Sequence, residues 1–306
     1  MKLIAFTAEA GFDHHPPDGH PERLERLHAV HRALEAEAAA QRPASLATSE
    51  QLARFHDTAH IDAVFAASPE QGETPLDADT WMSAGSLEAA LHAAGGGVDA
   101  VDAVMAGEAE AAFVACRPPG HHAEPDRAMG FCLFNTVGVA AMHALEAHGM
   151  AKVMVVDIDV HHGNGTQALA EIEPRLVFAS IHQGWIYPGT GAAHETGRTG
   201  NILNVPLPAG TDGRRWREAM EQWVLPRIEA EAPDLLLVSV GFDAHRADPL
   251  AGLALDESDY AWAGAVLGAR ARSVANSRLV CVLEGGYDCA ALEGSTRAFW
   301  RALADA

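Results

Sequence analysis

The sequence lacks the features of several large classes of protein. It contains 4 cysteines among 306 residues, and none form a Cys-x-x-Cys pair, which argues against a thiolate zinc site. No apolar run approaches the roughly 20 residues that a membrane span needs. Residues 1–12 lack the long apolar region and cleavage site of a signal peptide. We therefore expect a cytoplasmic protein with reduced thiols, and we expect Cys116 and Cys281 in the core.

Basic residues are also scarce. Lys and Arg total 21 against 42 Asp and Glu, which gives a formal net charge of -21. Such a chain repels the phosphates of nucleic acids and of anionic lipids, so we expect neither nucleic acid nor a membrane as a partner. The charge either attracts cationic substrates, such as lysine-bearing peptides or polyamines, or serves solubility alone.

Apolar runs alternate with helical patterns along the whole chain. Strands are expected at 3–6, 111–116, 153–160, 176–181, 235–240 and 279–283. Helices are expected at 21–40, 52–66, 86–105, 136–148, 214–231 with a kink at Pro226, 258–276 and 290–303. Strands rich in Val, Leu and Ile that are separated by helices indicate a mostly parallel sheet flanked by helices on both faces. Without repeats or low-complexity segments, residues 1–306 are expected to form a single α/β domain.

Polar clusters directly follow four of these strands. Arg-Pro-Pro-Gly-His-His occupies 117–122, and Asp-Ile-Asp-Val-His-His-Gly-Asn-Gly occupies 157–165. Gly-Phe-Asp-Ala-His occupies 241–245, and Glu-Gly-Gly-Tyr occupies 284–287. Open α/β sheets bind ligands beyond the carboxyl ends of their strands. One such cluster would be weak evidence, but four at one end of a sheet indicate a functional site.

The second cluster predicts a metal site. Side chains alternate along a strand, so Asp157, Asp159 and His161 point one way. Asp159 and His161 can then bind one cation, with Asp157 one step deeper. Carboxylate plus imidazole suits Zn²⁺, and also Fe²⁺ or Mn²⁺. Asp243 is the natural third ligand, and three protein ligands leave the open position that a catalytic site requires. Aspartates that merely cap turns are the alternative, but buried charges without a partner are costly.

Two other clusters supply acid/base and hydrogen-bonding groups. His121 and His122 reach one site only if the backbone turns tightly, which Gly120 permits; otherwise they are solvated loop histidines. Tyr287 follows two glycines, which let the backbone bend sharply and hold an aromatic ring over a cleft. Its phenol could donate a hydrogen bond to a developing oxyanion, or the ring could simply pack in a loop. His14 is expected on a rim loop without a catalytic role.

Together the motifs resemble those of the arginase/deacetylase superfamily, and within it the histone deacetylases and their class II-like bacterial deacetylase-like amidohydrolases. The match runs from residues 13–23 to Tyr287 and includes Gly-Phe-Cys-x-Phe-Asn at 130–135. The resemblance implies a single α/β domain with a mostly parallel sheet. It also implies zinc-dependent hydrolysis of an N-acetyl amide, foremost acetyl-lysine deacetylation of a peptide or protein, with Fe²⁺ as the alternative metal in the cell.

The resemblance further implies roles for individual residues. The zinc ligands are Asp159, His161 and Asp243, and the catalytic residues are His121, His122 and Tyr287. Two further residues hold the histidines: Asp157, which should hydrogen-bond to His121, and Asn164, which stands beside His122. The substrate channel consists of Gly130, Phe131, Tyr187 and Leu250. A structural potassium site is implied near Asp157, Asp159, His161, Ser180 and Ile181.

The sequence leaves several other functions open. Leu250 matches a position where polyamine-selective relatives carry Glu, so it favours acyl-lysine over acetylated polyamines; other small acyl amides and esters remain. A binuclear manganese ureohydrolase like arginase would need a second metal, for which Asp157 and Asp248 are the obvious candidates, and would leave Tyr287 unused. A non-catalytic acyl-lysine binder would not need the complete set of ligands, histidines and tyrosine. The sequence does not decide whether the chain assembles with copies of itself.

Overall fold

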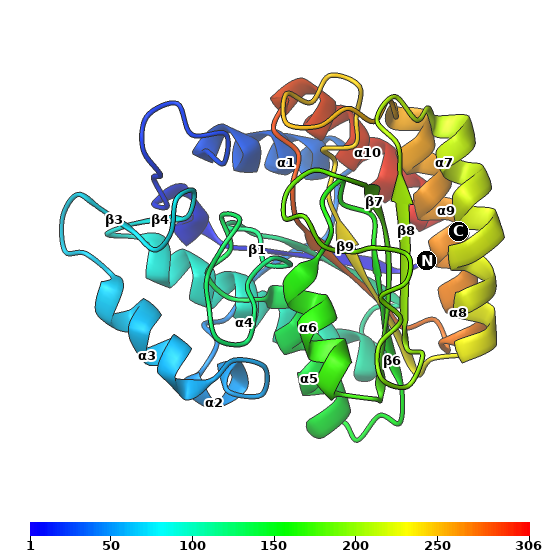
Figure 1. Ribbon diagram of the computed structural model, residues 1–306, viewed down its shortest axis with the longest axis horizontal. Helices are drawn as coiled ribbons and strands as arrows, with labels where there is room; N and C mark the ends of the chain where they lie inside the picture. Colours follow the sequence, from blue (N-terminus) through cyan, green and yellow to red (C-terminus); the bar gives the residue numbers. More distant parts are fainter.

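The computed structural model describes residues 1–306, and at its centre lies an eight-stranded sheet (Figure 1). The strand order is β2-β1-β5-β10-β9-β6-β7-β8, and every neighbouring pair runs parallel. The strands are β1 (Leu3–Thr7), β2 (Gln41–Pro43), β5 (Ala111–Ala115), β6 (Val153–Asp157), β7 (Leu176–Gln183), β8 (Ile202–Leu207), β9 (Leu235–Val240) and β10 (Leu279–Leu283). A separate antiparallel hairpin pairs β3 (Glu73–Pro75) with β4 (Trp81–Ser83).

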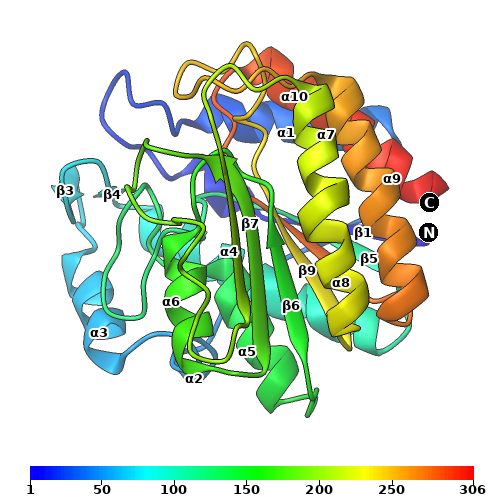
Figure 2. The ribbon, with the colours of Figure 1, turned by 45° about the vertical axis from the view of Figure 1, so that its right-hand side comes forward.

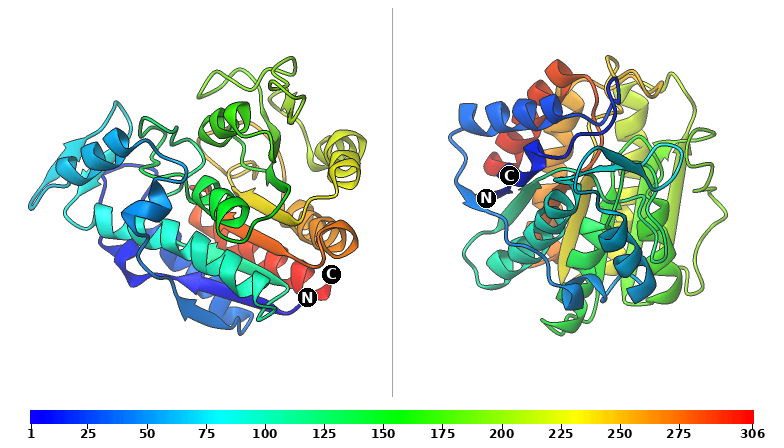
Figure 3. Two further views of the ribbon diagram at one scale, coloured as in Figure 1. Left: turned by 90° about the horizontal axis from the view of Figure 1, so that it is seen from below. Right: turned by 90° about the vertical axis from the view of Figure 1, so that its left-hand side faces the viewer.

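Helices cover both faces of the sheet (Figures 2 and 3). One face carries α2 (Ser49–Leu52), α3 (Thr58–Ala67), α4 (Ser86–Met105), α5 (Thr136–Glu146) and α6 (Asn164–Ile172). The other face carries α1 (Leu24–Ala36), α7 (Gly213–Ala219), α8 (Leu225–Glu231), α9 (Glu257–Val274) and α10 (Cys289–Asp305). The predicted α/β class is therefore confirmed. None of the helices combines the length and the apolar composition that a bilayer-crossing segment needs.

Alternation along strand β6 explains why it is apolar up to its last residue, Asp157. In β6, Val153 and Val155 belong to one hydrophobic core, whereas Met154 and Val156 belong to the other. Both faces of a parallel sheet are buried, so neither set of side chains in β6 is polar before Asp157. Cys116 lies in the first core and Cys281 in the second, as expected.

Several predicted boundaries were wrong. The helix expected at 52–66 is broken between Leu52 and Thr58. Long-range hydrogen bonds hold this segment, because His56 accepts from the backbone N–H of Asn135 at 2.9 Å and Asp57 N–H donates to the Pro125 carbonyl at 2.8 Å. The sequence prediction also missed the edge strands β2 and β8.

The helix expected at 214–231 is present, and its regular hydrogen bonding changes just before Pro226. A wider π-helical turn, Met220–Val224, joins α7 to α8, and Pro226 stands in the first turn of α8. Proline lacks an N–H and its ring crowds the preceding turn. A wider turn therefore accommodates the ring, and the two segments continue as one column of helix (Figure 2).

The four polar clusters follow four neighbouring strands at the centre of the sheet. These strands are β5, β10, β9 and β6, in that spatial order. All run in the same direction, so their carboxyl ends meet at one edge. The fold thus gathers segments that are far apart in the sequence.

Candidate active site

Two short turns bring Asp159 and His161 together, in place of the strand alternation that was expected. Strand β6 ends at Asp157 rather than at residue 160. The backbone N–H of Asp159 donates to Asp157 Oδ1 at 3.1 Å, and that of His161 donates to Asp159 Oδ1 at 2.8 Å. Aspartate side chains favour such turns because they bond to a backbone N–H two residues further on. The same carboxylates therefore end the strand and shape the site.

Asp243 reaches the same point from the end of β9. Its Oδ1 accepts the backbone N–H of Val160 at 2.9 Å, and its Oδ2 lies 3.2 Å from His161 Nδ1. Asp159 Oδ1 also lies 3.2 Å from that nitrogen. The three side chains are buried, and their ligand atoms lie within 4.8 Å of one another.

These three donors fit a Zn²⁺ ion. Burial and the nearby charge of Asp159 raise the pKa of Asp243 to about 7. Burial lowers the pKa of His161, but hydrogen bonds to the two carboxylates outweigh it and raise that pKa to about 10. Adjacent buried carboxylates thus require a positive charge, which a proton on His161 supplies. A divalent cation meets the same requirement, and two carboxylates with one imidazole are donors that zinc accepts.

Glycine is required where these carboxylates approach the backbone. A Cβ atom on Gly285 would lie 2.0 Å from Asp243 Oδ2, and one on Gly241 would lie 1.9 Å from Asp159 Oδ2. The N–H of Gly285 instead donates to Asp159 Oδ2 at 2.8 Å. The two motif glycines therefore make room for the ligands.

The tandem histidines occupy a tight turn after β5. The N–H groups of Gly120 and His121 donate to Glu284 Oε2 at 2.7 and 3.1 Å, which ties the turn to the end of β10. The ring centroids of His121 and His122 are 4.0 Å apart. Glu284 opens the Glu-Gly-Gly-Tyr motif, but the sequence prediction gave it no role.

Each imidazole has a different partner. His121 Nδ1 lies 2.9 Å from Asp157 Oδ2, and His122 Nδ1 lies 2.8 Å from Asn164 Oδ1. Burial lowers the pKa of His121, but the surrounding carboxylates, Asp157 first, outweigh it and raise that pKa well above its usual value. Burial and the charges of two neighbouring histidines hold the pKa of His122 well below its usual value. Carboxylates around His121 therefore favour its charged form, whereas burial and neighbouring histidines around His122 favour its neutral form.

Tyr287 is held from both sides. Its backbone N–H donates to Asp248 Oδ2 at 2.7 Å, and the Arg26 guanidinium lies 4.8 Å from its ring centroid. Burial raises the pKa of the phenol well above its usual value, so the hydroxyl remains a donor. Gly286, with φ of 123°, supplies the backbone conformation that turns the ring toward the site.

A cavity of about 210 Å³ joins these groups to the surface. The lining residues are Asp79, His122, Gly130, Phe131, His161, Tyr187, Leu250 and Tyr287. The rings of Phe131 and Tyr287 meet edge to face at 5.8 Å, and Tyr187 meets His122 at 5.1 Å. Every channel residue implied by the family resemblance thus lines one cavity, and Asp79 joins them without having been predicted.

A buried ion cluster behind the cavity was also missed. Glu22 accepts from Arg26 Nη1 at 2.9 Å and from Arg117 Nη2 at 2.6 Å, and it lies 3.1 Å from His14 Nε2. His14 is therefore buried, not on the rim. Arg26 also donates to the carbonyls of Glu284 and Gly286, so the cluster fixes the loop that carries Tyr287. The available signals for this cluster were Arg117 in Arg-Pro-Pro-Gly-His-His and the matching segment 13–23, which contains His14 and Glu22.

We expect Glu22→Gln to lower the free energy of unfolding by about 3–5 kcal/mol, because it leaves two buried guanidinium groups without a counter-charge. Urea denaturation measures this loss. Glu25→Gln, at an exposed position on α1, is the matched control and should change stability by less than about 0.5 kcal/mol. Equal effects of the two substitutions would contradict the expectation.

The remaining predicted residues, Ser180, Ile181 and Asp248, do not line the cavity. Ser180 is paired with Asp157 in the sheet register, and its hydroxyl lies 2.8 Å from His182 Nδ1. Ile181 is buried in the core that faces α7–α10. The potassium site near these residues stays a prediction. Asp248 accepts the N–H groups of Leu250 and Tyr287 and does not join the ligand cluster.

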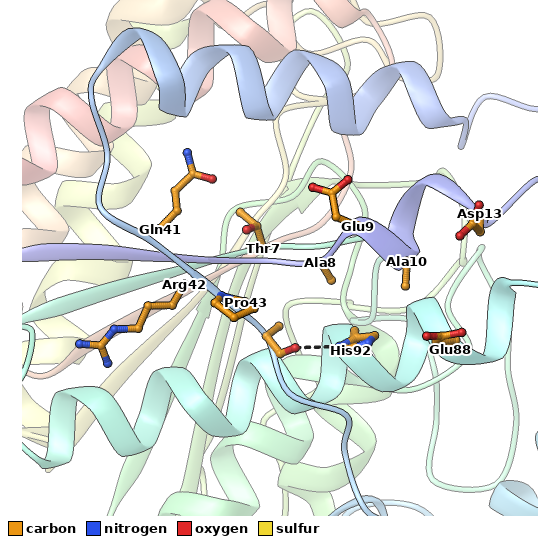
Figure 4. A pocket seen from close by; sticks show the side chains of 11 residues that line it. Thr7, Ala8, Glu9, Ala10, Asp13, Gln41, Arg42, Pro43, Glu88 and His92 are labelled. Atoms are coloured by element: carbon orange, nitrogen blue, oxygen red, sulfur yellow. Dashed lines mark hydrogen bonds between the residues drawn. The ribbon is translucent and has the colours of Figure 1, made fainter.

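A wider groove lies at the carboxyl ends of β1 and β2, away from these motifs (Figure 4). Its volume is about 600 Å³, and Glu9, Asp13 and Glu88 contribute acidic side chains to its lining. His92 Nδ1 is bonded to the Ala44 carbonyl at 2.7 Å. The groove contains none of the predicted catalytic, metal-binding or channel residues, so size alone does not identify the site.

Comparison with known proteins agrees with this geometry. Residues 20–303 match the histone deacetylase domain family. The histone deacetylase-like amidohydrolase of Pseudomonas aeruginosa is 41% identical over 250 residues, which cover 80% of this chain and 66% of that protein. A probable deacetylase of Methanothermobacter thermautotrophicus is 37% identical over 305 residues, covering 95% of this chain and 88% of that protein. The crystal structure of the HDA15 HD domain has a TM-score of 0.93 and 34% identity, covering 99% of this chain and 91% of that chain. The chain therefore belongs to the histone deacetylase family.

Proposed function

We propose that the chain is a zinc-dependent deacetylase that hydrolyses the N-acetyl amide of acetylated lysine side chains in peptides or proteins. The observation that carries this proposal is the cavity whose lining joins His122, His161 and Tyr287. Its aromatic walls, Phe131 and Tyr187, suit the uncharged aliphatic stem of an acyl-lysine. Membership in a family of acyl-amide hydrolases supports the reaction class.

Asp159, His161 and Asp243 would hold the metal ion. Bound Zn²⁺ supplies Lewis acidity, which polarises a carbonyl and lowers the pKa of an attacking water molecule. Fe²⁺ suits the same donors. Removal of metal with a chelator should abolish hydrolysis of an acetyl-lysine peptide, and added Zn²⁺ should restore it.

The histidines have distinct roles in this proposal. Asn164 Nδ2 donates to Glu124 Oε1 at 2.6 Å, so Asn164 Oδ1 faces His122 and accepts from its Nδ1–H. His122 Nε2 therefore has a free lone pair, with which it takes a proton from the attacking water. His122 later returns that proton to the leaving amine. The carboxylate of Asp157, 2.9 Å from His121 Nδ1, favours the charged imidazole, so His121 would contribute positive charge rather than a base.

Two further groups act on the substrate. The Tyr287 hydroxyl donates a hydrogen bond to the carbonyl oxygen as negative charge develops on it. The Gly130 carbonyl accepts the N–H of the substrate amide and holds it in the channel. Water adds to the acyl carbon, the C–N bond breaks, and acetate and a free amine leave.

The neutral partner of His122 leads to a prediction about pH. Asn164→Asp places a carboxylate beside the Nδ1–H and raises the pKa of His122. His122 must be neutral to accept a proton, so the acid limb of the kcat profile should move upward by about one to two pH units. The new carboxylate would also face that of Glu124, and the two negative charges would repel each other. The Asn164→Asp/Glu124→Gln double variant removes this repulsion, and Glu124→Gln alone is its control. An unchanged acid limb would count against the pairing.

Substrate choice is tested by rates on an acetyl-lysine peptide, longer acyl-lysines and acetylated polyamines. Leu250 lies in the cavity lining and keeps the mouth apolar there, so we expect kcat/KM to be highest on the acetyl-lysine peptide. Leu250→Glu should shift the preference toward acetylated polyamines. No hydrolysis of any acyl amide by the zinc-loaded protein would contradict the enzymatic proposal.

One observation favours acetylated polyamines as the second candidate. Asp79 lies in the cavity lining and carries an acidic side chain, although its Oδ1 also accepts the Gly130 N–H at 3.2 Å. The strongly negative chain would attract the same cationic substrates. Asp79→Asn should then reduce hydrolysis of acetylated polyamines more than that of a neutral acetyl-lysine peptide.

A further inference from the structure

Two histidines and an aspartate meet between α4 and α5, outside the candidate active site. Asp102 lies on α4, His143 lies on α5, and His148 follows the end of α5. Asp102 Oδ1 lies 2.8 Å from His143 Nε2 and 2.6 Å from His148 Nε2. The two rings stand nearly perpendicular, at 82°, with centroids 5.1 Å apart. Both imidazoles therefore direct the same nitrogen at one carboxylate oxygen.

This cluster lies at the opposite end of the sheet from the candidate active site. His148 precedes the first residue of β6, Val153, whereas Asp157 at the last residue of that strand begins the active-site motif. The four residue steps along the strand from Val153 to Asp157 span about 13 Å. Helices α4 and α5 lie side by side over one face of the sheet (Figures 1 and 3). The cluster is thus separate from the proposed catalytic machinery.

The donors have the composition of a transition-metal site. Their ligand atoms lie within 4.8 Å of one another, as in the Asp159–His161–Asp243 cluster. Two imidazoles and one carboxylate suit Zn²⁺, Ni²⁺ or Cu²⁺ and leave further positions for water. The side chains of His143, His148 and Asp102 are 9%, 26% and 52% exposed. An ion can therefore enter from solvent, and it would be held less tightly than in the fully buried site.

Arg54 determines which ring nitrogen of His143 carries a proton. Its Nη1 contacts His143 Nδ1, and a guanidinium can only donate, so Nδ1 accepts and Nε2 carries the proton. A metal ion on Nε2 requires that proton to move to Nδ1, and Arg54 must then withdraw. Glu50 and Glu146, at 3.5 and 3.9 Å, are carboxylates to which Arg54 can turn.

We propose that Asp102, His143 and His148 form a second metal site, for Zn²⁺ or a similar transition-metal ion, with Arg54 as a competitor built into the fold. The bound ion replaces the proton between His143 and Asp102 and ties the ends of α4 and α5 together. The zinc-loaded chain therefore carries two ions, of which only the tighter one serves hydrolysis. This site does not depend on the proposed deacetylase activity.

Equilibrium dialysis against Zn²⁺ at pH 8 tests the proposal. Wild-type protein should bind two equivalents. Asp102→Asn and His148→Ala should each lose the weaker equivalent and keep the tighter one, with hydrolytic activity unchanged. His28→Ala, at an exposed position on α1, is the matched control and should keep both. Asp243→Asn should lose the tighter equivalent and keep the weaker one.

Arg54→Met should strengthen zinc binding at the second site, whereas Asp102→Asn and His148→Ala should abolish it. Arg54→Met removes the competing donor, so the weaker equivalent should bind about tenfold more tightly. A zinc-induced rise in the Tm of Asp243→Asn protein, absent from Asp243→Asn/His148→Ala, provides a readout that needs no activity. One equivalent in the wild type up to a tenfold excess of Zn²⁺ would overturn the proposal. So would a weaker equivalent that survives both Asp102→Asn and His148→Ala.

Discussion

Asp243→Asn is expected to lower kcat/KM for an acetyl-lysine peptide by at least about 10³-fold, because metal catalysis supplies several kcal/mol of transition-state stabilisation. The substitution keeps the side-chain shape but replaces a charged ligand by a neutral amide. Asp243 Oδ2 lies 3.2 Å from His161 Nδ1, so the change falls directly on the ligand cluster. The value of kcat/KM and the bound zinc, measured on the same preparation, should fall together.

The control for this experiment is Asp212→Asn. Asp212 accepts the backbone N–H of Arg215 at the start of α7, at 2.9 Å, and Asn caps a helix about as well as Asp. Its activity and metal content should match the wild type. If Asp243→Asn kept its tighter zinc equivalent and its rate, Asp243 would not be a ligand.

Tyr287→Phe should reduce kcat by about 10²–10³-fold, the usual consequence of losing one oxyanion donor. The hydroxyl acts mainly when negative charge develops on the carbonyl oxygen, so KM should change little. The ring would keep its contacts with Phe131 and Arg26, so zinc content and stability should also be retained. Stopped or continuous assays over a range of acetyl-lysine peptide concentrations separate the two parameters.

Tyr260→Phe is the matched control for Tyr287→Phe. Tyr260 is fully buried, and its hydroxyl has no hydrogen-bond partner. Removal of that hydroxyl should leave kcat unchanged. A loss of less than about tenfold in Tyr287→Phe would remove Tyr287 from the proposed role.

Some features of the site could be predicted because they depend on local pattern alone. An apolar run followed by polar residues signals a buried strand with a ligand-binding end, whatever surrounds it. The stretch from Asp157 to His161 is one example, and Glu-Gly-Gly-Tyr at 284–287 is another. The predicted geometry of the first was nevertheless wrong, because Asp157 and Asp159 accept backbone N–H groups and end the strand early.

Other features depend on contacts between distant segments, which local pattern does not record. Glu22 and Arg117 are 95 residues apart in sequence, yet they share a buried ion pair. Glu284 accepts two N–H groups from the turn at Gly120 and His121. The break between α2 and α3 has the same origin, since the bonds that hold it come from residues 125 and 135.

The sequence by itself determined the α/β class, the strands that end in polar clusters and the side chains with ligand chemistry, because strand periodicity and donor type are local properties. Only the tertiary structure decided that β5, β10, β9 and β6 are neighbours, and hence that Asp243 lies against His161 and Tyr287 beside Phe131. It also gives the contacts of the partners that the family resemblance implied, with Asp157 Oδ2 2.9 Å from His121 Nδ1 and Asn164 Oδ1 2.8 Å from His122 Nδ1. Burial and neighbouring charges set the protonation of these groups, and both arise only when the chain is folded.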